Sequence, residues 1–260
     1  MIRRTALTLA VAASLGLAAP AHSADVFKPG KGDQVKLGQR AAAEVRKKEK
    51  VLPASDERVR TLRRVAGRLL AQVDDGKDPW QYSFDVIDNK QVNAFALPGG
   101  PTFFFTGLLD RLSTEDQLAG VLAHELTHVR REHWAYAYRN QQQRALGLNL
   151  LLIFTRANST MGGIASIAND LLFTLPFSRA NEEQSDSQGM DMMVKAGYNP
   201  QGMREVFEIL SKTSGGKPPE FLSTHPNDKA RIGKIQAKID KMGKNFGPQT
   251  PLPWARTTAG

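Results

Sequence analysis

The residues best suited to chemistry form a short run in which two histidines stand four positions apart. His124, Glu125 and His128 make the pattern H-E-x-x-H. On a helix, positions i and i+4 lie one turn apart on the same face, so both imidazoles can bind one metal ion. Glu125 is rotated to the side, where its carboxylate can reach a water molecule at the metal instead of the metal itself. The pattern therefore predicts a zinc site with the Glu125 carboxylate beside a metal-bound water.

A catalytic zinc site needs a third protein ligand and one open position. One extended form of the pattern places a third histidine six residues after the second, but Trp134 stands there in this chain. His133 cannot replace it, because five residues turn a continuous helix by about 140° from His128. We interpret His133 as a packing or surface histidine.

A later acidic segment offers the third ligand instead. Glu182 and Asp186 are four residues apart and share a helix face. Glu182 could bind the metal, while Asp186 could accept a hydrogen bond from a ligating histidine and fix its tautomer. Glu183 is the rival ligand, although it points about 100° away and loses the pairing with Asp186.

The elements that must position these residues form one α+β domain over residues 24–246, mainly helical with a small β-sheet. Apolar residues at helical spacing predict six helices, at about 35–50, 55–73, 114–138, 179–195, 201–213 and 226–242. Alternation predicts a strand at 82–88, and a hairpin of 92–97 and 102–106 around Pro98-Gly99-Gly100-Pro101. Ser113 is the expected capping residue of the helix that carries the H-E-x-x-H pattern.

The stretch from 145 to 177 is mostly apolar but interrupted. Charged and polar side chains divide it, and Gly162-Gly163 breaks it, so no run reaches the length of a membrane span. We expect residues 145–175 to pack as helices beside the active-site cleft and to limit access to it. A loop that dips into a membrane is the alternative.

Composition restricts the chemistry and the location. The 260 residues include no cysteine, which excludes disulfides, thiolate zinc sites, iron–sulfur clusters and a lipoprotein anchor. Residues 1–23 have the charge, the apolar run and the small residues of a secretory signal cleaved before Ala24 or after Ala21, with a retained anchor as the alternative. The Ala-rich signal predicts a bacterial periplasmic protein. Residues 247–260 hold three prolines and predict an extended tail.

The formal net charge of +9 has two interpretations. A solvated basic surface is one, and attraction to an anionic surface such as the inner leaflet of an outer membrane is the other. Nucleic-acid binding is not expected, because the chain is predicted to be exported and carries no zinc-finger, helix-turn-helix or aromatic-flanked basic motif.

Four segments in matching order resemble the HtpX and CAAX prenyl endopeptidase family of zinc metallopeptidases, among the gluzincins. The chain is most similar to the small periplasmic members of the LoiP and BepA type. The resemblance covers roughly residues 35–240, with Ser185 standing where the family usually has alanine. It rests on 93–100 with 106–109, on 124–128, on 178–186, and on 224–226 with 231–232.

The resemblance implies a zincin-type fold with one Zn²⁺ per protomer and a role for each site residue. His124, His128 and Glu182 correspond to the zinc ligands, Glu125 to the general base and Asp186 to the supporting carboxylate. His225 lies on a loop that approaches the metal in relatives. There it could stabilise the oxyanion, or it could occupy the open position as a latency ligand.

The predicted function is that of an exported zinc-dependent endopeptidase acting on unfolded or misfolded envelope proteins. We expect the substrate chain to add as a strand along the edge formed by Asn93, Ala94, Phe95 and Ala96. Expected partners are unfolded polypeptides, with peripheral association with the outer membrane or with envelope assembly proteins. The alternatives are a latent or non-proteolytic chaperone that retains the zinc fold, and a zinc hydrolase acting on peptidoglycan peptides.

Overall fold

The computed structural model describes residues 27–155, 177–212, 219–226, 229–243 and 246–257. The expected signal at 1–23 and residues 156–176 of the apolar stretch lie outside these ranges. Within them the protein is mainly helical with one three-stranded sheet, so the predicted α+β class is confirmed.

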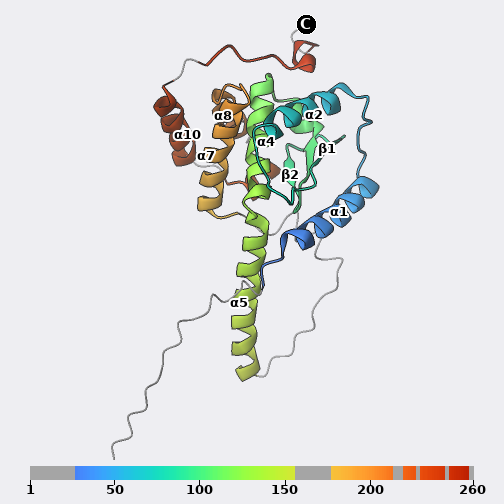
Figure 1. Cartoon of the computed structure of the whole chain (residues 1–260), viewed down its shortest axis with the longest axis vertical. Coiled ribbons are helices and arrows are strands. Elements are labelled where there is room, and N and C mark those ends of the chain that lie inside the picture. The colour runs from blue at the N-terminus through green and yellow to red at the C-terminus, as the bar shows by residue number, and fades with distance from the viewer. Residues whose placement is uncertain (1–26, 156–176, 213–218, 227–228, 244–245, 258–260) are drawn as a thin grey trace, which may run out of the picture.

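The central element is the helix α4 (Glu115–Arg130), which is buried along nearly its whole length (Figure 1). The Oγ1 of Thr114 accepts a hydrogen bond from the Gln117 backbone N–H and caps the helix. Ser113 was expected in this role, and that prediction was wrong. The backbone N–H of Ser113 instead donates to the Gln117 side chain. The capping residue is therefore one position later than expected.

The helix predicted at 114–138 is two helices, because α4 ends at Arg130 and α5 (His133–Thr155) starts three residues later. Glu132 has φ 54°, in the left-handed region that a residue with a Cβ seldom adopts. Lys28 Nζ and Gln34 Nε2 each lie 2.7 Å from its Oε2. These contacts with the chain far upstream hold the turn, which resets the helical phase before His133.

Helices cover α4 on two sides. α7 (Arg179–Lys195) and α8 (Gln201–Lys212) pack along one side, with α10 (Lys229–Met242) outside them (Figure 1). α2 (Glu57–Leu70) and the sheet lie on the other side. The predicted helices at 55–73, 179–195, 201–213 and 226–242 are confirmed, while the short α9 (Glu220–Thr224) was not foreseen.

The sheet has the order β1-β3-β2 and leaves β2 at an edge. β1 (Ser83–Ile87) runs parallel to β3 (Pro101–Phe105), and β2 (Ala94–Ala96) pairs antiparallel with β3, so the predicted strand and hairpin are confirmed. The turn needs glycine at two positions, because Gly99 and Gly100 have φ 86° and 122°. α3 (Thr106–Leu109) follows the hairpin directly.

The first helix, α1 (Lys31–Lys48), confirms the prediction at 35–50 and covers the other face of the sheet. Its buried Ala41, Ala42 and Val45 form a separate small core with side chains of all three strands. This cluster joins the first helix to the hairpin. It therefore supports the edge strand β2 from the side opposite α4.

The proline-rich tail is attached to the domain. The Glu115 N–H donates to the Thr250 carbonyl at 2.7 Å, and the Trp254 indole donates to the Leu109 carbonyl at 3.1 Å. Leu252 is fully buried just before the 3₁₀ helix η1 (Pro253–Thr257). The tail thus covers the start of α4, outside the boundary that we placed at 246.

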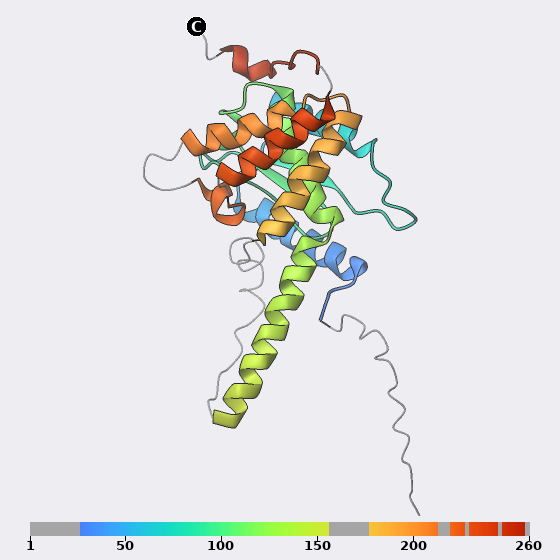
Figure 2. The same cartoon turned by 90° about the vertical axis from the view of Figure 1, so that its left-hand side faces the viewer.

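Residues 145–155 of the apolar stretch belong to α5, which is helical to Thr155 as expected. Both views show it extending beyond the body of the fold instead of packing beside a cleft (Figures 1 and 2). The expected covering role is therefore not seen in α5, because the turn at Glu132 directs this helix outward. None of the described helices combines the length and apolar character needed to cross a membrane.

The close packing of α4 and α8 predicts an asymmetric response to alanine. A Cβ on Gly202 would lie 2.4 Å from the Asp116 carbonyl carbon, whereas one on the exposed Gly67 of α2 would meet nothing within 4 Å. Gly202→Ala should lower the free energy of unfolding by about 1–3 kcal/mol. Gly67→Ala should raise it by up to about 1 kcal/mol, because alanine favours a helix interior. Thermal unfolding of both variants checks this, and equal melting temperatures would contradict the packing.

Candidate metal centre

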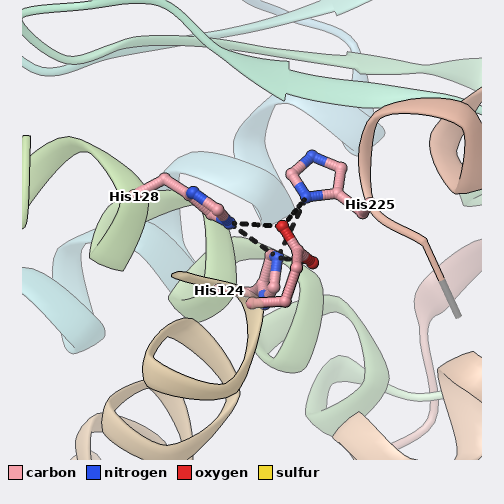
Figure 3. A group of neighbouring side chains, drawn as sticks. His124, His128 and His225 are labelled. Carbon is pink, nitrogen blue, oxygen red and sulfur yellow. Dashed lines mark hydrogen bonds and ion pairs between the residues drawn. The ribbon is translucent and has the colours of Figure 1, made fainter. Parts of the chain in front are cut away.

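Three imidazoles and one carboxylate converge in the interior. His124 and His128 come from α4, Glu182 from the first turn of α7, and His225 directly follows α9. Each is at most 4% exposed, and their ligand atoms all lie within 4.8 Å of one another. Figure 3 shows the three labelled imidazoles turned toward one another around a carboxylate. The H-E-x-x-H spacing and the later acidic helix thus meet in space.

The spacing of these atoms fits one tetrahedral metal ion. Four ligand atoms about 2.0–2.1 Å from a zinc ion lie about 3.3–3.4 Å apart. The Nε2 atoms of His124 and His128 are 3.0 Å apart, and Glu182 Oε1 is 3.4 Å from His128 Nε2. His225 Nδ1 lies 3.1 Å from Glu182 Oε1 and 3.2 Å from His124 Nε2. The donor set of imidazole nitrogen and carboxylate oxygen is also the one that zinc prefers.

Glu182, and not Glu183, faces this cluster. Glu183 is exposed on α7 and forms an ion pair with Lys234 of α10. Glu182 and Glu183 differ in burial because α7 packs only one side of its first turn against α4. Glu182 is therefore the candidate third ligand, which agrees with the helical spacing that we used to prefer it.

A second carboxylate and a guanidinium orient His124. Asp186 Oδ1 lies 2.9 Å from His124 Nδ1, which leaves His124 Nε2 facing the cluster. Arg231 donates to both oxygens of Asp186, at 2.6 and 2.8 Å, and its Nη1 lies 2.6 Å from Glu182 Oε2. The sequence resemblance included Arg231 among its matching residues but assigned it no role. The signal that could have found it is electrostatic, since three buried carboxylates require a nearby cation.

The pKa values show how the buried groups of the cluster share charge. Burial disfavours a charged His124, but hydrogen bonds with Asp186 and Glu182 outweigh it and raise its pKa to about 9. Burial opposes ionisation of Glu182, yet His225, His124 and His128 hold the pKa of this carboxyl well below its usual range. Burial also lowers the pKa of His128 well below its usual value.

Glu125 lies beside the cluster and contacts the edge strand. Its Oε2 accepts a hydrogen bond from the Ala96 N–H at 3.0 Å, and its Oε1 lies 3.3 Å from His225 Nε2. That Oε1 is buried without a hydrogen bond among the described residues. Burial raises the pKa of Glu125, which makes the carboxylate a better proton acceptor.

The predicted substrate edge divides into two kinds of residue. The Phe105 N–H donates to the Asn93 carbonyl and the Leu97 N–H to the Pro101 carbonyl, so backbone groups of odd-numbered residues, including Phe95, face β3. The backbone groups of Ala94 and Ala96 therefore face outward. Because the Ala96 N–H is bound to Glu125, the outward groups left for a partner strand are the Ala94 N–H and both carbonyls.

His133 is a buried histidine in contact with the site, and it is no surface residue. Its Nδ1 lies 3.0 Å from His128 Nδ1, and its Nε2 lies 2.8 Å from Gln184 Oε1. Burial lowers the pKa of His133, although the hydrogen bond with Gln184 opposes this. It stays outside the ligand cluster, as expected. The angle that we used assumed a continuous helix, and the turn at Glu132 changes it.

The approach to the cluster is narrow in this conformation. The Phe177 ring covers His128, with their centroids 4.0 Å apart. The cavity between the edge strand and His128 measures about 10 Å³, which is about the space of one water molecule. A polypeptide can reach the cluster from this side only if Phe177 or its neighbours move.

A helix that presents H-E-x-x-H against a glutamate of a later helix, beside an edge strand, defines a metallopeptidase class of site. The match of residues 56–239 to the model of Peptidase family M48 makes the assignment specific, and the chain belongs to that family. This confirms the resemblance seen in the sequence.

Three relatives illustrate the range of similarity. The chain is 31% identical over 188 residues to the beta-barrel assembly-enhancing protease of Yersinia pestis, covering 68% of this chain and 38% of that protein. It is 32% identical over 201 residues to the mitochondrial metalloendopeptidase OMA1 of Schizosaccharomyces pombe, covering 72% and 55%. It is 28% identical over 218 residues to the metalloprotease LoiP of Escherichia coli, covering 81% and 82%. The chain thus spans less than half the length of the first of these.

The placement of the two glutamates predicts different metal affinities for their variants. Glu182→Gln should lose zinc on dialysis, because it removes the ligating charge from the cluster. Glu183→Gln should keep one zinc per chain, because it only breaks an ion pair with the exposed Lys234. Elemental analysis of the dialysed proteins measures this. The reverse pattern would assign the third ligand to Glu183.

Proposed function

We propose that this chain is a zinc-dependent endopeptidase that cleaves unfolded or misfolded proteins of the cell envelope. The observation that carries the proposal is the position of Glu125. Its Oε1, without a hydrogen bond among the described residues, lies beside four convergent metal-ligand atoms, while its Oε2 is bound to the edge strand. One carboxylate thus connects the candidate metal centre to the strand along which a polypeptide would lie.

In this mechanism His124, His128 and Glu182 would hold the metal. Zinc, when bound, polarises the scissile carbonyl and lowers the pKa of a water molecule toward about 7. Glu125 accepts the proton of the attacking water at Oε1 and then delivers it to the leaving amine. The Ala96 N–H holds Oε2 and keeps the carboxylate oriented during both transfers.

Substrate binding is proposed to use the backbone of β2. A polypeptide that adds as a strand would pair with the outward N–H of Ala94 and with the carbonyls of Ala94 and Ala96. Backbone pairing depends little on side chains, so it suits unfolded chains of varied sequence. The Asn93 and Phe95 backbones face β3 and would support this edge without touching the substrate.

The proposed location is the periplasm, with residues 1–23 acting as an export signal that is then cleaved. The three relatives are named for proteolysis, and one of them for enhancing beta-barrel assembly. These names support polypeptides as substrates and an association with proteins that assemble beta-barrels. The basic net charge of the chain is compatible with an anionic membrane surface.

A latent enzyme, or a chaperone that retains the metal fold, is the second candidate. The observation in its favour is His225, whose Nδ1 is a fourth member of the ligand cluster. The Phe221 ring stacks on this imidazole at 4.7 Å, and the His225 N–H donates to the Phe221 carbonyl. A histidine held in this way would occupy the position that an active centre leaves open.

The general-base role predicts a large loss for a small change. Glu125→Gln should reduce cleavage of casein by about 10²–10⁴-fold or more, because the amide cannot accept the proton. Its zinc content should stay at one per chain, since Glu125 is not a ligand. Glu183→Gln is the matched control and should cleave like the wild type. A zinc-loaded wild type that leaves casein intact would favour the latent or chaperone function.

Removal of His225 separates its two possible roles. We expect His225→Ala to cleave casein faster than the wild type and to hold zinc less tightly, because the fourth position opens to water. A role in stabilising the oxyanion would instead lower the rate by about 10²–10³-fold with zinc retained. Rate and zinc content measured on the same sample distinguish these outcomes. If neither changes, both roles are wrong.

A further inference from the structure

His128 can bind a metal only in one of its two neutral tautomers. A neutral imidazole has one N–H and one lone pair, on different ring nitrogens. The Nε2 of His128 faces the cluster, 3.0 Å from His124 Nε2 and 3.4 Å from Glu182 Oε1. The metal therefore needs the lone pair on Nε2, and the proton of His128 must be on Nδ1. Whatever lies opposite Nδ1 must accept a hydrogen bond.

The group opposite Nδ1 is His133. The two Nδ1 atoms are 3.0 Å apart, so His133 can accept this proton only if its own Nδ1 is unprotonated. Its proton must then be on Nε2, which lies 2.8 Å from Gln184 Oε1. A carbonyl oxygen can only accept, so Gln184 stabilises this tautomer of His133. In this arrangement His128 donates to His133, and His133 donates to Gln184.

We propose that His133 is a positioning residue that fixes the metal-binding tautomer and the ring orientation of His128, with Gln184 fixing the tautomer of His133. The inference rests on the proposed function to the extent that His128 binds the metal. It assigns to a neutral imidazole the task that a carboxylate performs for His124, where Asp186 lies opposite Nδ1. The two ligands on α4 are thus oriented by chemically different partners.

The backbone turn at Glu132 makes this contact possible. On a continuous helix, His133 would point away from His128. The left-handed φ of Glu132 restarts the helix, and His133 becomes the first residue of α5 with its ring against His128. The imidazole is 2% exposed, so water does not compete for the hydrogen bond.

One other group could donate to the same acceptor. The Ser185 Oγ lies 3.4 Å from His133 Nδ1, which is longer than the 3.0 Å to His128. The shorter contact is the one that the metal-binding tautomer requires. Ser185→Ala is therefore a matched control. It removes the competing donor and leaves the hydrogen bonds between His128, His133 and Gln184 intact.

The test compares two side chains of similar size at position 133. The oxygen of asparagine can take the place of the histidine Nδ1, whereas leucine offers no acceptor. His133→Leu should weaken zinc binding by about 10–100-fold. His133→Asn and Ser185→Ala should bind zinc with affinity close to the wild type. Competition with a chromophoric chelator measures the affinities, and circular dichroism confirms that each variant is folded.

A spectroscopic readout reports the tautomer directly. Long-range ¹⁵N–¹H correlation spectra of the zinc-loaded wild type should show the His128 proton on Nδ1 and the His133 proton on Nε2. If His133→Leu does not fold, the exposed Gln184 offers a second pair. Gln184→Met should weaken zinc binding, and Gln184→Glu should not, because only the carboxylate keeps an acceptor.

Three outcomes would overturn the inference. One is zinc affinity in His133→Leu equal to that of the wild type, and another is an equal loss in His133→Leu and His133→Asn, which would indicate packing alone. The third is a His133 proton on Nδ1 in the zinc-loaded protein. A wild type that binds no zinc would instead contradict the proposed function. Failure of that function can therefore be told apart from failure of the inference about His133.

Discussion

The site depends on the compensation of negative charge that is buried in the interior. Glu182 and Asp186 are each no more than 3% exposed, and one guanidinium, that of Arg231, contacts both. A buried carboxylate without a partner is costly, and removal of one member of such a group typically destabilises a protein by about 3–5 kcal/mol. Because Arg231 belongs to α10 and the carboxylates to α7, this interaction also joins the two helices.

The same network determines which atoms face the metal position. Asp186 lies opposite His124 Nδ1 and leaves Nε2 for the metal, while Arg231 keeps Asp186 ionised and in place. The ligand atoms of the cluster lie at separations near those of a tetrahedral site.

The elements to which we assign catalysis and substrate binding meet because α4 packs on the sheet and on α7 at once. The side of α4 that carries His124 and His128 faces α7, and Glu125 reaches β2 through the Ala96 N–H. The edge strand is supported from behind by α1. Displacement of β2 would thus change the orientation of Glu125, so under the proposed mechanism the position of the substrate strand is coupled to that of the general base.

The sequence by itself determined the local features of this protein. Helical spacing placed both histidines of α4 on one face and preferred Glu182 over Glu183, and the Pro-Gly-Gly-Pro turn located the hairpin. These features depend on residues within a few positions of one another. A repeat of four residues or a turn motif therefore carries enough information to predict them.

Only the tertiary structure decided the features that need distant partners. The turn at Glu132 is held by Lys28 and Gln34, about a hundred residues away, so no periodicity near position 132 could reveal the end of α4. The same turn directs α5 outward and brings His133 against His128. Arg231 acquires its role in the same way, because its carboxylate partners lie 45 or more residues upstream and meet it only when α7 and α10 pack together.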